Sequence, residues 1–118
     1  MPAAAPDSHV DALQHIRTLL GPAGCIDAPE RMARFLTDFR GLYRGATPFV
    51  ACPATTAEVS QVLAFCNAAR IAVVPQGGNT SYCGGATPSA RGDQLVLSLH
   101  RLNRIRAVDA ANFSLIAE

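Results

Sequence analysis

The stretch "VVPQGGNTSYCGGATPSA", residues 73–90, decides the fold of this chain and points to its function. Two β-branched residues run into a proline, and two glycine pairs follow at 77–78 and 84–85, with small polar residues between them. Apolar β-branched residues closed by a proline predict a buried strand. Glycine pairs predict backbone conformations that other residues seldom adopt. We therefore expect a side-chain-poor loop that leaves the end of a strand.

A strand–helix–strand unit precedes this loop. The segment "FVACP", residues 49–53, indicates a short buried strand, and "IAVV", residues 71–74, indicates a second strand that Pro75 closes. Between them, Thr55 and Glu58 have the spacing of a capping box at the start of a helix. One apolar face of this helix is expected to contain Val59, Val62, Leu63 and Cys66. Such a unit usually forms a right-handed crossover between parallel strands.

Two helices are expected before this unit. Ser8 can cap the first helix, which the pair Gly21 and Pro22 ends. Pro29 lies in the first turn of the second helix, where its missing N–H group costs nothing. Both helices carry apolar residues at helical spacing, so each is expected to pack one face against a core.

Two further strands are expected after the loop. The segment "QLVLSLH", residues 94–100, predicts a strand, and we interpret His100 at its end as a surface histidine. Residues 106–111 are interpreted as a connector with some strand character, and "NFSLIAE", residues 112–118, as a final strand. Because this last pattern continues to Glu118 without a turn, we expect the sequence to be part of a longer chain.

Composition excludes several classes of function. The 118 residues carry a net charge of +1, which implies neither nucleic acid nor an acidic membrane as a partner. All ten basic residues are arginine, so no lysine can form a Schiff base or a phosphate-binding Walker loop. The four cysteines form no C-x-x-C pair, so no metal site is expected. No signal peptide or transmembrane run is visible, and we expect a cytoplasmic protein with reduced thiols.

The chemistry of the glycine loop suits an anion. Without side chains in the way, consecutive N–H groups of residues 77–78 can converge on a phosphate, and the polar residues 79–81 add short hydrogen-bonding groups. The glycine spacing matches neither the G-x-G-x-x-G fingerprint nor a Walker loop. From the residues alone, the alternative of a structural turn with Tyr82 packed over it is equally supported.

Three segments of the chain resemble a known family. They are "VACPATTAEVSQVLAFCNAARIAVVPQGGNTS" at residues 50–81, "QLVLSLHRLNRI" at 94–105 and "VDAANFSLIAE" at 108–118. Together they are similar to the first part of the FAD-binding domain of the vanillyl-alcohol oxidase and p-cresol methylhydroxylase superfamily. The nearest branch is the FAD-linked 2-hydroxy-acid dehydrogenases, which include D-2-hydroxyglutarate dehydrogenase, D-lactate dehydrogenase and the glycolate oxidase flavin subunit. The resemblance covers about residues 38–118.

The resemblance implies which residues hold the cofactor. In the family, the matching loop wraps the FAD pyrophosphate with backbone amides, and this role would fall to Pro75, Gly77, Gly78, Asn79, Thr80 and Ser81. Gly84 and Gly85 match a glycine pair that comes close to the flavin. Pro53 matches a proline near the adenine end. Some covalent family members carry a histidine where this chain has Asn79, so the resemblance implies non-covalent FAD.

The resemblance also implies a reaction. Hydride transfer from the carbon that bears the hydroxyl group to the flavin would convert a small 2-hydroxy acid to a 2-oxo acid. The groups that contact the substrate lie in parts of family members beyond this match, so no catalytic residue and no metal ligand is assigned here. The electron acceptor is unknown, although one other than molecular oxygen is expected. The isolated chain is expected to lack activity.

The implied fold class is α+β, namely the N-terminal part of the p-cresol methylhydroxylase-type FAD-binding fold, with a small mixed β-sheet flanked by helices. Residues 1–37 would form an N-terminal helical segment, and residues 38–118 the first part of the FAD-binding domain. Self-association of the chain through an unpaired strand edge is also expected. Two alternatives remain: another flavoenzyme of the same superfamily, such as a sugar or alcohol oxidase, and a stand-alone glycine-loop binding or assembly module without redox activity.

Overall fold

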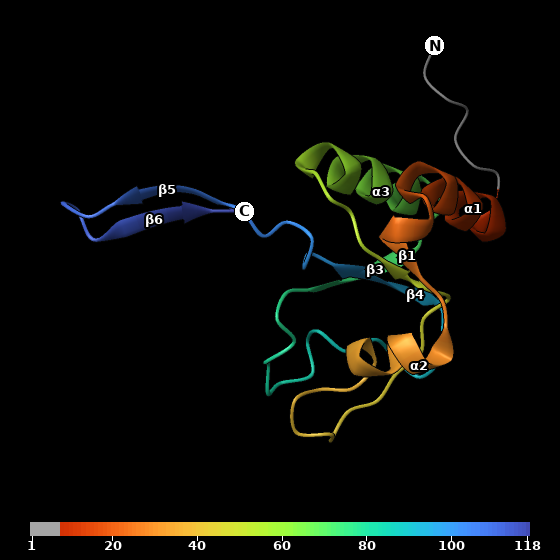
Figure 1. Cartoon of the computed structure of the whole chain (residues 1–118). Coiled ribbons are helices and arrows are strands. Elements are labelled where there is room, and N and C mark those ends of the chain that lie inside the picture. The colour runs from red at the N-terminus through yellow and green to blue at the C-terminus, as the bar shows by residue number, and fades with distance from the viewer. Residues whose placement is uncertain (1–7) are drawn as a thin grey trace, which may run out of the picture.

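The computed structural model describes residues 8–118, so residues 1–7 of the expected N-terminal segment lie outside the described part. Its elements, in chain order, are α1 (His9–Leu20), η1 (Pro22–Gly24), β1 (Cys25–Ile26), α2 (Pro29–Met32), η2 (Ala33–Phe35), β2 (Val50–Ala51), α3 (Thr56–Ala68), β3 (Ala72–Gln76), β4 (Gln94–Ser98), β5 (Ile105–Asp109) and β6 (Ser114–Ala117). Four strands form a mixed sheet in the order β1-β2-β4-β3, with α1 and α3 on one face and α2 on the other (Figure 1). This arrangement confirms the expected fold class.

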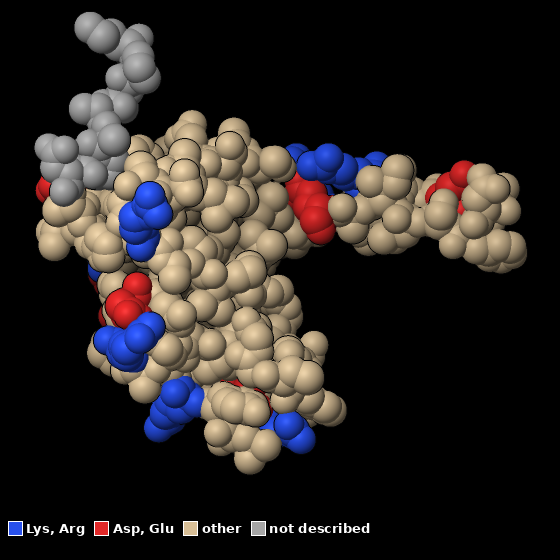
Figure 2. All heavy atoms as spheres, turned by 180° about the vertical axis from the view of Figure 1, so that it is seen from behind, with Lys and Arg blue, Asp and Glu red and all other residues tan. Residues whose placement is uncertain are grey.

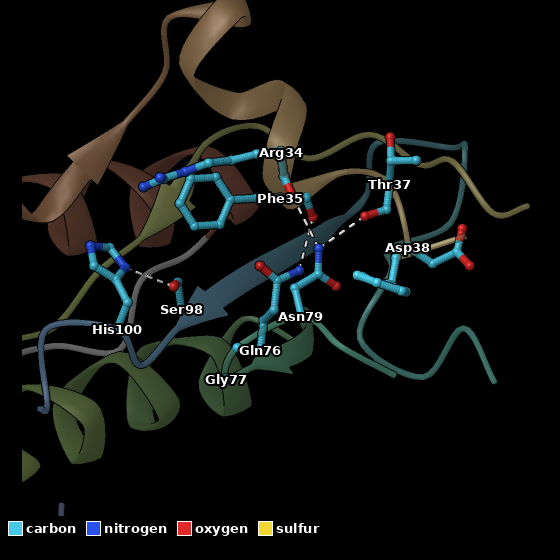
Figure 3. Close-up of a pocket in the computed structure, with 11 residues that line it drawn as sticks. Arg34, Phe35, Thr37, Asp38, Gln76, Gly77, Asn79, Ser98 and His100 are labelled. Carbon is cyan, nitrogen blue, oxygen red and sulfur yellow. Dashed lines mark hydrogen bonds between the residues drawn. The ribbon is translucent and has the colours of Figure 1, made fainter. Parts of the chain in front are cut away.

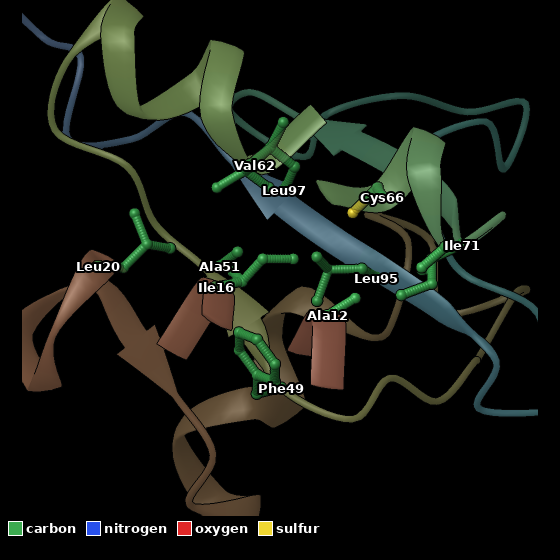
Figure 4. Packing of buried hydrophobic residues seen from close by; sticks show 11 residues of the cluster. Ala12, Ile16, Leu20, Phe49, Ala51, Val62, Cys66, Ile71, Leu95 and Leu97 are labelled. Atoms are coloured by element: carbon green, nitrogen blue, oxygen red, sulfur yellow. The ribbon is translucent and has the colours of Figure 1, made fainter. Parts of the chain in front are cut away.

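Side chains of β4 alternate between the two faces of the sheet, so that helices pack on both faces. Leu95 and Leu97 point to one face, where they pack under α1 and α3 (Figure 4). The buried residues on this face are Ala12, Ile16, Leu20, Phe49, Ala51, Val62, Cys66, Ala69, Ile71, Leu95 and Leu97. Val96 points to the other face and packs with Ile26 and Phe35, which belong to β1 and η2. Both faces of β4 are therefore covered, and β4 is the centre of the core.

The two strands of the expected strand–helix–strand unit are parallel, but they do not pair with each other. Val96 of β4 is the register partner of both Val50 in β2 and Val74 in β3. The strand–helix–strand unit therefore encloses a third strand, which the chain adds only after the glycine loop. Sequence periodicity cannot reveal this insertion, because it depends on pairing between segments that are distant in the chain.

Two local expectations are corrected by the structure. Pro75 does not close its strand, because β3 continues to Gln76. A proline is tolerated there because β3 is an edge strand, where its missing N–H group faces no partner. Leu63 is not on the buried face of α3 but is 43% exposed. The strand character expected within residues 106–111 is confirmed, because residues 106–109 belong to strand β5.

A two-stranded hairpin, β5–β6, projects from the body of the molecule (Figure 1). Both strands are exposed along their whole length. At the base of the hairpin, a carboxylate oxygen of Glu118 lies 2.8 Å from Arg104 and 3.5 Å from Arg106, and Figure 2 shows this charged group where the arm leaves the body. Side-chain hydrogen bonds from Arg104 to Glu118 lower the pKa of this carboxyl to about 2.

None of the helices within residues 8–118 has both the length and the apolar character that a membrane crossing requires.

The capping box at the start of α3 gives a first prediction. The Thr55 hydroxyl accepts a hydrogen bond from the Glu58 N–H group at 3.1 Å, and the Glu58 carboxylate accepts one from the Ala54 N–H group. Thr55→Ala should lower the free energy of unfolding by about 1 kcal/mol, because a helix N–H group loses its acceptor. Urea denaturation measures this loss. Thr56→Ala, an exposed change one residue along, is the matched control, and an equal loss in both variants would contradict the cap.

Candidate functional site

The carboxyl ends of three parallel strands meet at one edge of the sheet. β2 is followed there by Pro53, β3 by the pair Gly77 and Gly78, and β4 by His100 two residues after its end. In open sheets with parallel strands, ligands bind outside these carboxyl ends. The topology therefore brings the glycine loop and two other chain segments to the edge where a ligand is expected.

A pocket of about 590 Å³ lies at this edge, on the face of the sheet that η2 covers (Figure 3). Its lining comes from four places: η2 and the connector after it, the end of β3, the glycine loop, and the end of β4. Among the lining residues are Arg34, Phe35, Asp38, Gln76, Asn79 and His100. Gly77 and Gly78 lie between Gln76 and Asn79 and contribute bare backbone to the wall.

The first glycine pair is not required by the fold of the chain. Neither Gly77 nor Gly78 has a positive φ, so the expectation of a glycine-only backbone conformation at this pair is wrong. A Cβ atom added to Gly77 would meet nothing within 4 Å, and one added to Gly78 would only touch Thr80 at 4.0 Å. By contrast, a Cβ on Gly45 would lie 1.8 Å from the carbonyl oxygen of Pro88. The space beside the first pair is therefore free for an atom from outside the chain.

The left-handed conformations of the loop fall on other residues. Asn79 has φ of 55° and Gly84 has φ of 76°. Asparagine tolerates this region better than most residues, because its short polar side chain can hydrogen-bond nearby. A Cβ on Gly84 would also press on the Tyr43 ring at 3.0 Å, so both conformation and packing require glycine there. The second glycine pair thus contains a structural residue, whereas the first does not.

Two side-chain amides fasten the loop to the opposite wall. Nδ2 of Asn79 donates to the carbonyl oxygens of Arg34 and Thr37, at 3.0 and 2.9 Å. Nε2 of Gln76, which is buried, donates to the carbonyl oxygens of Phe35 and Ala86, both at 2.9 Å (Figure 3). Each amide donates both of its N–H groups to backbone carbonyls. The loop is therefore held open by hydrogen bonds that do not depend on a ligand.

The connector after η2 is ordered by Asp38. Its carboxylate accepts hydrogen bonds from the N–H groups of Tyr43 at 2.7 Å and Arg40 at 3.3 Å. The Tyr43 N–H group contributes most to lowering the pKa of Asp38. Although Asp38 lines the pocket, its carboxylate is engaged by its own loop.

The outer part of the glycine loop contacts the same connector. The guanidinium group of Arg40 donates to the carbonyl oxygen of Tyr82 at 2.8 Å and lies over the Tyr82 ring. The Phe39 and Tyr82 rings are stacked with centroids 5.9 Å apart. Tyr82 is 55% exposed, so it does not close the loop. The bulky tyrosine is accommodated at the rim and leaves the pocket accessible.

The sequence-predicted site residues separate into two groups. Gly77, Gly78 and Asn79 line the pocket. The others lie outside its lining, namely Pro53, Pro75, Thr80, Ser81, Gly84 and Gly85. Pro53 is fully buried at the end of β2, and Pro75 is exposed in β3. These residues stay predictions for a cofactor larger than this one pocket.

The pocket residues that the sequence does not assign to the site include Arg34, Gln76, Ser98 and His100. His100 is exposed, as the sequence predicts, and its Nδ1 atom also lies 2.9 Å from the hydroxyl of buried Ser98. One signal for this wall was present. Gln76 and Ser98 are polar residues at the ends of two apolar strands, and as register partners they share a face. A buried polar pair at the carboxyl ends of parallel strands favours a site.

Other reactive side chains in the described part do not assemble. Within residues 8–118, no group of three or more histidines, cysteines or carboxylates could hold a metal ion. The four cysteines are free. Burial raises the pKa of the Cys52 and Cys66 thiols to about 11, which suits small residues of the core.

Sequence comparison finds a family model described as "FAD binding domain" that matches residues 47–118. A relative from Oryza sativa subsp. indica, named "Probable D-2-hydroxyglutarate dehydrogenase, mitochondrial", is 36% identical over 108 residues, which is 92% of this chain and 19% of the relative. The mitochondrial D-2-hydroxyglutarate dehydrogenase of Arabidopsis thaliana is 33% identical over 106 residues, or 90% of this chain and 19% of the relative. The glycolate oxidase subunit GlcD of Bacillus subtilis is 29% identical over 104 residues, which is 88% of this chain and 22% of the relative.

Solved structures share the fold. Alkyldihydroxyacetonephosphate synthase superposes with a TM-score of 0.73 at 16% identity, over 94% of this chain and 22% of that one. p-Cresol methylhydroxylase superposes with a TM-score of 0.64 at 23% identity, over 83% of this chain and 19% of that one. At these identities the likeness concerns the fold alone.

The relatives correct one expectation. Several of them are named as mitochondrial enzymes, which points to the mitochondrion and contradicts the cytoplasmic location expected from the sequence. The expectation rested on reduced thiols and on the N-terminal residues of this sequence. Reduced thiols do not separate these compartments, and the chain spans only 19% of the rice and Arabidopsis relatives.

The amide of Asn79 gives a second prediction. Asn79→Asp would replace two N–H donors with oxygens that face two carbonyl groups, so the free energy of unfolding should fall by about 1–3 kcal/mol. Hydrogen exchange should become faster in residues 34–37, which lose their link to the glycine loop. Asn103→Asp, an exposed change, is the matched control. Unaltered exchange at residues 34–37 would mean that the amide does not hold this wall.

Proposed function

Because this chain belongs to the FAD-binding domain family whose model matches residues 47–118, we propose that it builds the phosphate-holding part of the cofactor site in an FAD-dependent 2-hydroxy-acid dehydrogenase. The membership confirms the resemblance inferred from the sequence and identifies FAD as the cofactor. The observation that carries the proposal is the first glycine pair, which lines the pocket although neither backbone conformation nor packing requires glycine there.

The described residues fit the cofactor. A dinucleotide carries two adjacent phosphates, and these need N–H donors at close range with no side chain between them. The open space beside Gly77 and Gly78 supplies such an approach, and a Cβ atom at either position would occupy it. Asn79 and Gln76 hold this backbone in place through their amides. The chain can thus present a preformed surface, which lowers the entropy that binding must lose.

The remaining predicted residues extend this surface in the proposal. Pro75, Thr80 and Ser81 would continue the phosphate loop. Gly84 and Gly85 would lie toward the flavin ring, and Pro53 toward the adenine. FAD would be bound without a covalent bond to residue 79, since both N–H groups of the Asn79 amide already serve backbone carbonyls.

The reaction follows from the cofactor. When bound, FAD supplies a two-electron oxidant that can accept a hydride from the hydroxyl-bearing carbon of a 2-hydroxy acid. The residues of this chain bind and orient the cofactor, and none of them is assigned to proton transfer. The substrate would be of the D-2-hydroxyglutarate, D-lactate or glycolate class, which the names of the relatives support. The acceptor of the electrons would be a molecule other than oxygen.

The proposal includes a division of the chain. Residues 1–37 would be a mainly helical N-terminal segment that adds β1 to the sheet, and residues 38–118 the first part of the FAD-binding domain within a longer protein. The isolated chain would be inactive and would self-associate through its exposed strands. Family membership argues against the alternative of a binding module without a redox role.

Cofactor binding gives a third prediction. In the full-length protein that carries this chain, Gly78→Val should weaken FAD binding by about tenfold or more, because the new side chain fills the approach to the phosphates. The melting temperature of the cofactor-free protein should stay the same, since the space is open. Ala90→Val, at an exposed residue outside the pocket, is the control. Unchanged flavin retention in Gly78→Val would remove the basis of the proposal.

Activity gives a fourth prediction. The full-length protein purified with FAD should bleach its flavin absorbance when mixed anaerobically with D-2-hydroxyglutarate, D-lactate or glycolate, and an artificial dye should restore the colour. Simple sugars and aromatic alcohols serve as comparison substrates. Bleaching by these alone would assign the protein to another flavoenzyme class, and a protein without flavin would overturn the proposed function.

A further inference from the structure

We propose that Arg34 and His100 form a two-donor clamp for a phosphate group of the cofactor, with Ser98 fixing which imidazole nitrogen carries the proton. The inference rests on the proposed function and adds side chains to the backbone donors of the glycine loop. Nothing in the glycine motif itself points to these three residues, which come from η2 and from the end of β4.

Both donors border the same aromatic ring. The guanidinium carbon of Arg34 lies 4.7 Å from the centroid of the Phe35 ring. The imidazole of His100 lies 5.9 Å from the same ring, centroid to centroid, and is tilted by 40°. Phe35 is buried, so it gives the two polar groups a fixed support. Figure 3 shows Arg34 and His100 together at one end of the pocket, with Asp38 at the other end.

Ser98 decides the tautomer of His100. Its hydroxyl is fully buried, and its one hydrogen bond within residues 8–118 is to Nδ1 of His100, at 2.9 Å. A buried hydroxyl hydrogen without an acceptor is costly, so the hydroxyl donates and Nδ1 accepts. The proton of the neutral imidazole is then on Nε2. His100 thus offers an N–H donor on the ring edge away from Ser98.

The charges around His100 keep it in this form. Partial burial, followed by the positive charges of Arg34 and Arg101, lowers the pKa of His100. Protonation would also place a hydrogen on Nδ1 and leave the Ser98 hydroxyl without an acceptor. Arg101 is engaged elsewhere, because it donates to the carbonyl oxygen of Cys52 at 2.9 Å. Asp38 is engaged by its own connector.

The N–H groups of Arg34 and His100 that have no acceptor in the protein are suited to bind an anion. Within residues 8–118, the Arg34 guanidinium group makes no hydrogen bond or ion pair with another residue. Its N–H groups and the Nε2–H group of His100 are therefore free to donate, while the pocket carboxylate is not free to accept. A phosphate offers acceptor oxygens in several directions and can be shared by a guanidinium, an imidazole and backbone N–H groups. The clamp thus adds two side-chain donors to the backbone donors of the glycines that line the same pocket.

The test uses the full-length protein and a matched set of variants. His100→Leu and Arg34→Leu remove one donor each, and each should weaken FAD binding by about tenfold or more, measured by equilibrium dialysis. His100→Gln keeps an N–H group near Nε2 and should retain most of the affinity. His9→Leu changes an exposed histidine of α1 and should leave the affinity unchanged. Thermal unfolding without FAD checks that each variant folds.

A second measurement separates the clamp from the flavin. Inorganic pyrophosphate is added to the protein while nitrogen NMR follows the imidazole of His100. Before the addition, Nδ1 should appear as an unprotonated acceptor, and pyrophosphate should shift the Nε2–H resonance. Ser98→Ala should yield a mixture of the two tautomers, which a purely structural role of the serine would not produce.

The outcomes distinguish the two proposals. Weaker FAD binding in His100→Leu and Arg34→Leu, together with the pyrophosphate shift, supports the clamp. A shift with pyrophosphate in a protein that takes up no FAD would support the phosphate clamp but overturn the proposed function. FAD affinity that is the same in wild type, His100→Leu and Arg34→Leu would overturn the clamp while leaving the proposed function standing.

Discussion

Two side-chain amides fix the shape of the candidate site. Gln76 and Asn79 lie on either side of the glycine pair, and their N–H groups reach four backbone carbonyls, three of them in the segment 34–37. A loop with so little side chain has many conformations, and ordering it costs entropy. Here the cost is offset by hydrogen bonds inside the protein, because each amide donates to two backbone carbonyls. The wall of the pocket and the loop therefore form one unit.

That unit depends on the position of β4. Because β4 lies between β2 and β3, its Ser98 becomes the register partner of Gln76, and both face η2. The same insertion brings His100 beside Phe35, although the two residues are far apart in the chain. The core and the site thus share one strand. Leu95 and Leu97 anchor β4 under the helices, while its last residues line the pocket.

The fold requires some glycines of the loop but not others. Gly84 has a positive φ and packs against Tyr43, so the fold requires it. Gly77 and Gly78 satisfy no such requirement, and their bare backbone faces open space at the pocket. The proposed function assigns that space to the phosphates of FAD. Two glycine pairs that look alike in the sequence therefore have different physical reasons.

Local sequence patterns were enough to predict the caps, most of the strands and the position of the glycine loop. Ser8 and Thr55 cap their helices as their spacing predicts, and the apolar segments around residues 50, 73 and 96 form strands. Only the tertiary structure decided which strand lies between the others, which glycines are free, and that His100 joins Arg34 at the pocket. The physical reason is the distance along the chain over which each kind of interaction acts. Caps, turns and periodicity act between residues a few positions apart, whereas strand order and pocket walls come from contacts between segments tens of residues apart, such as the bond from Asn79 to the carbonyl of Arg34.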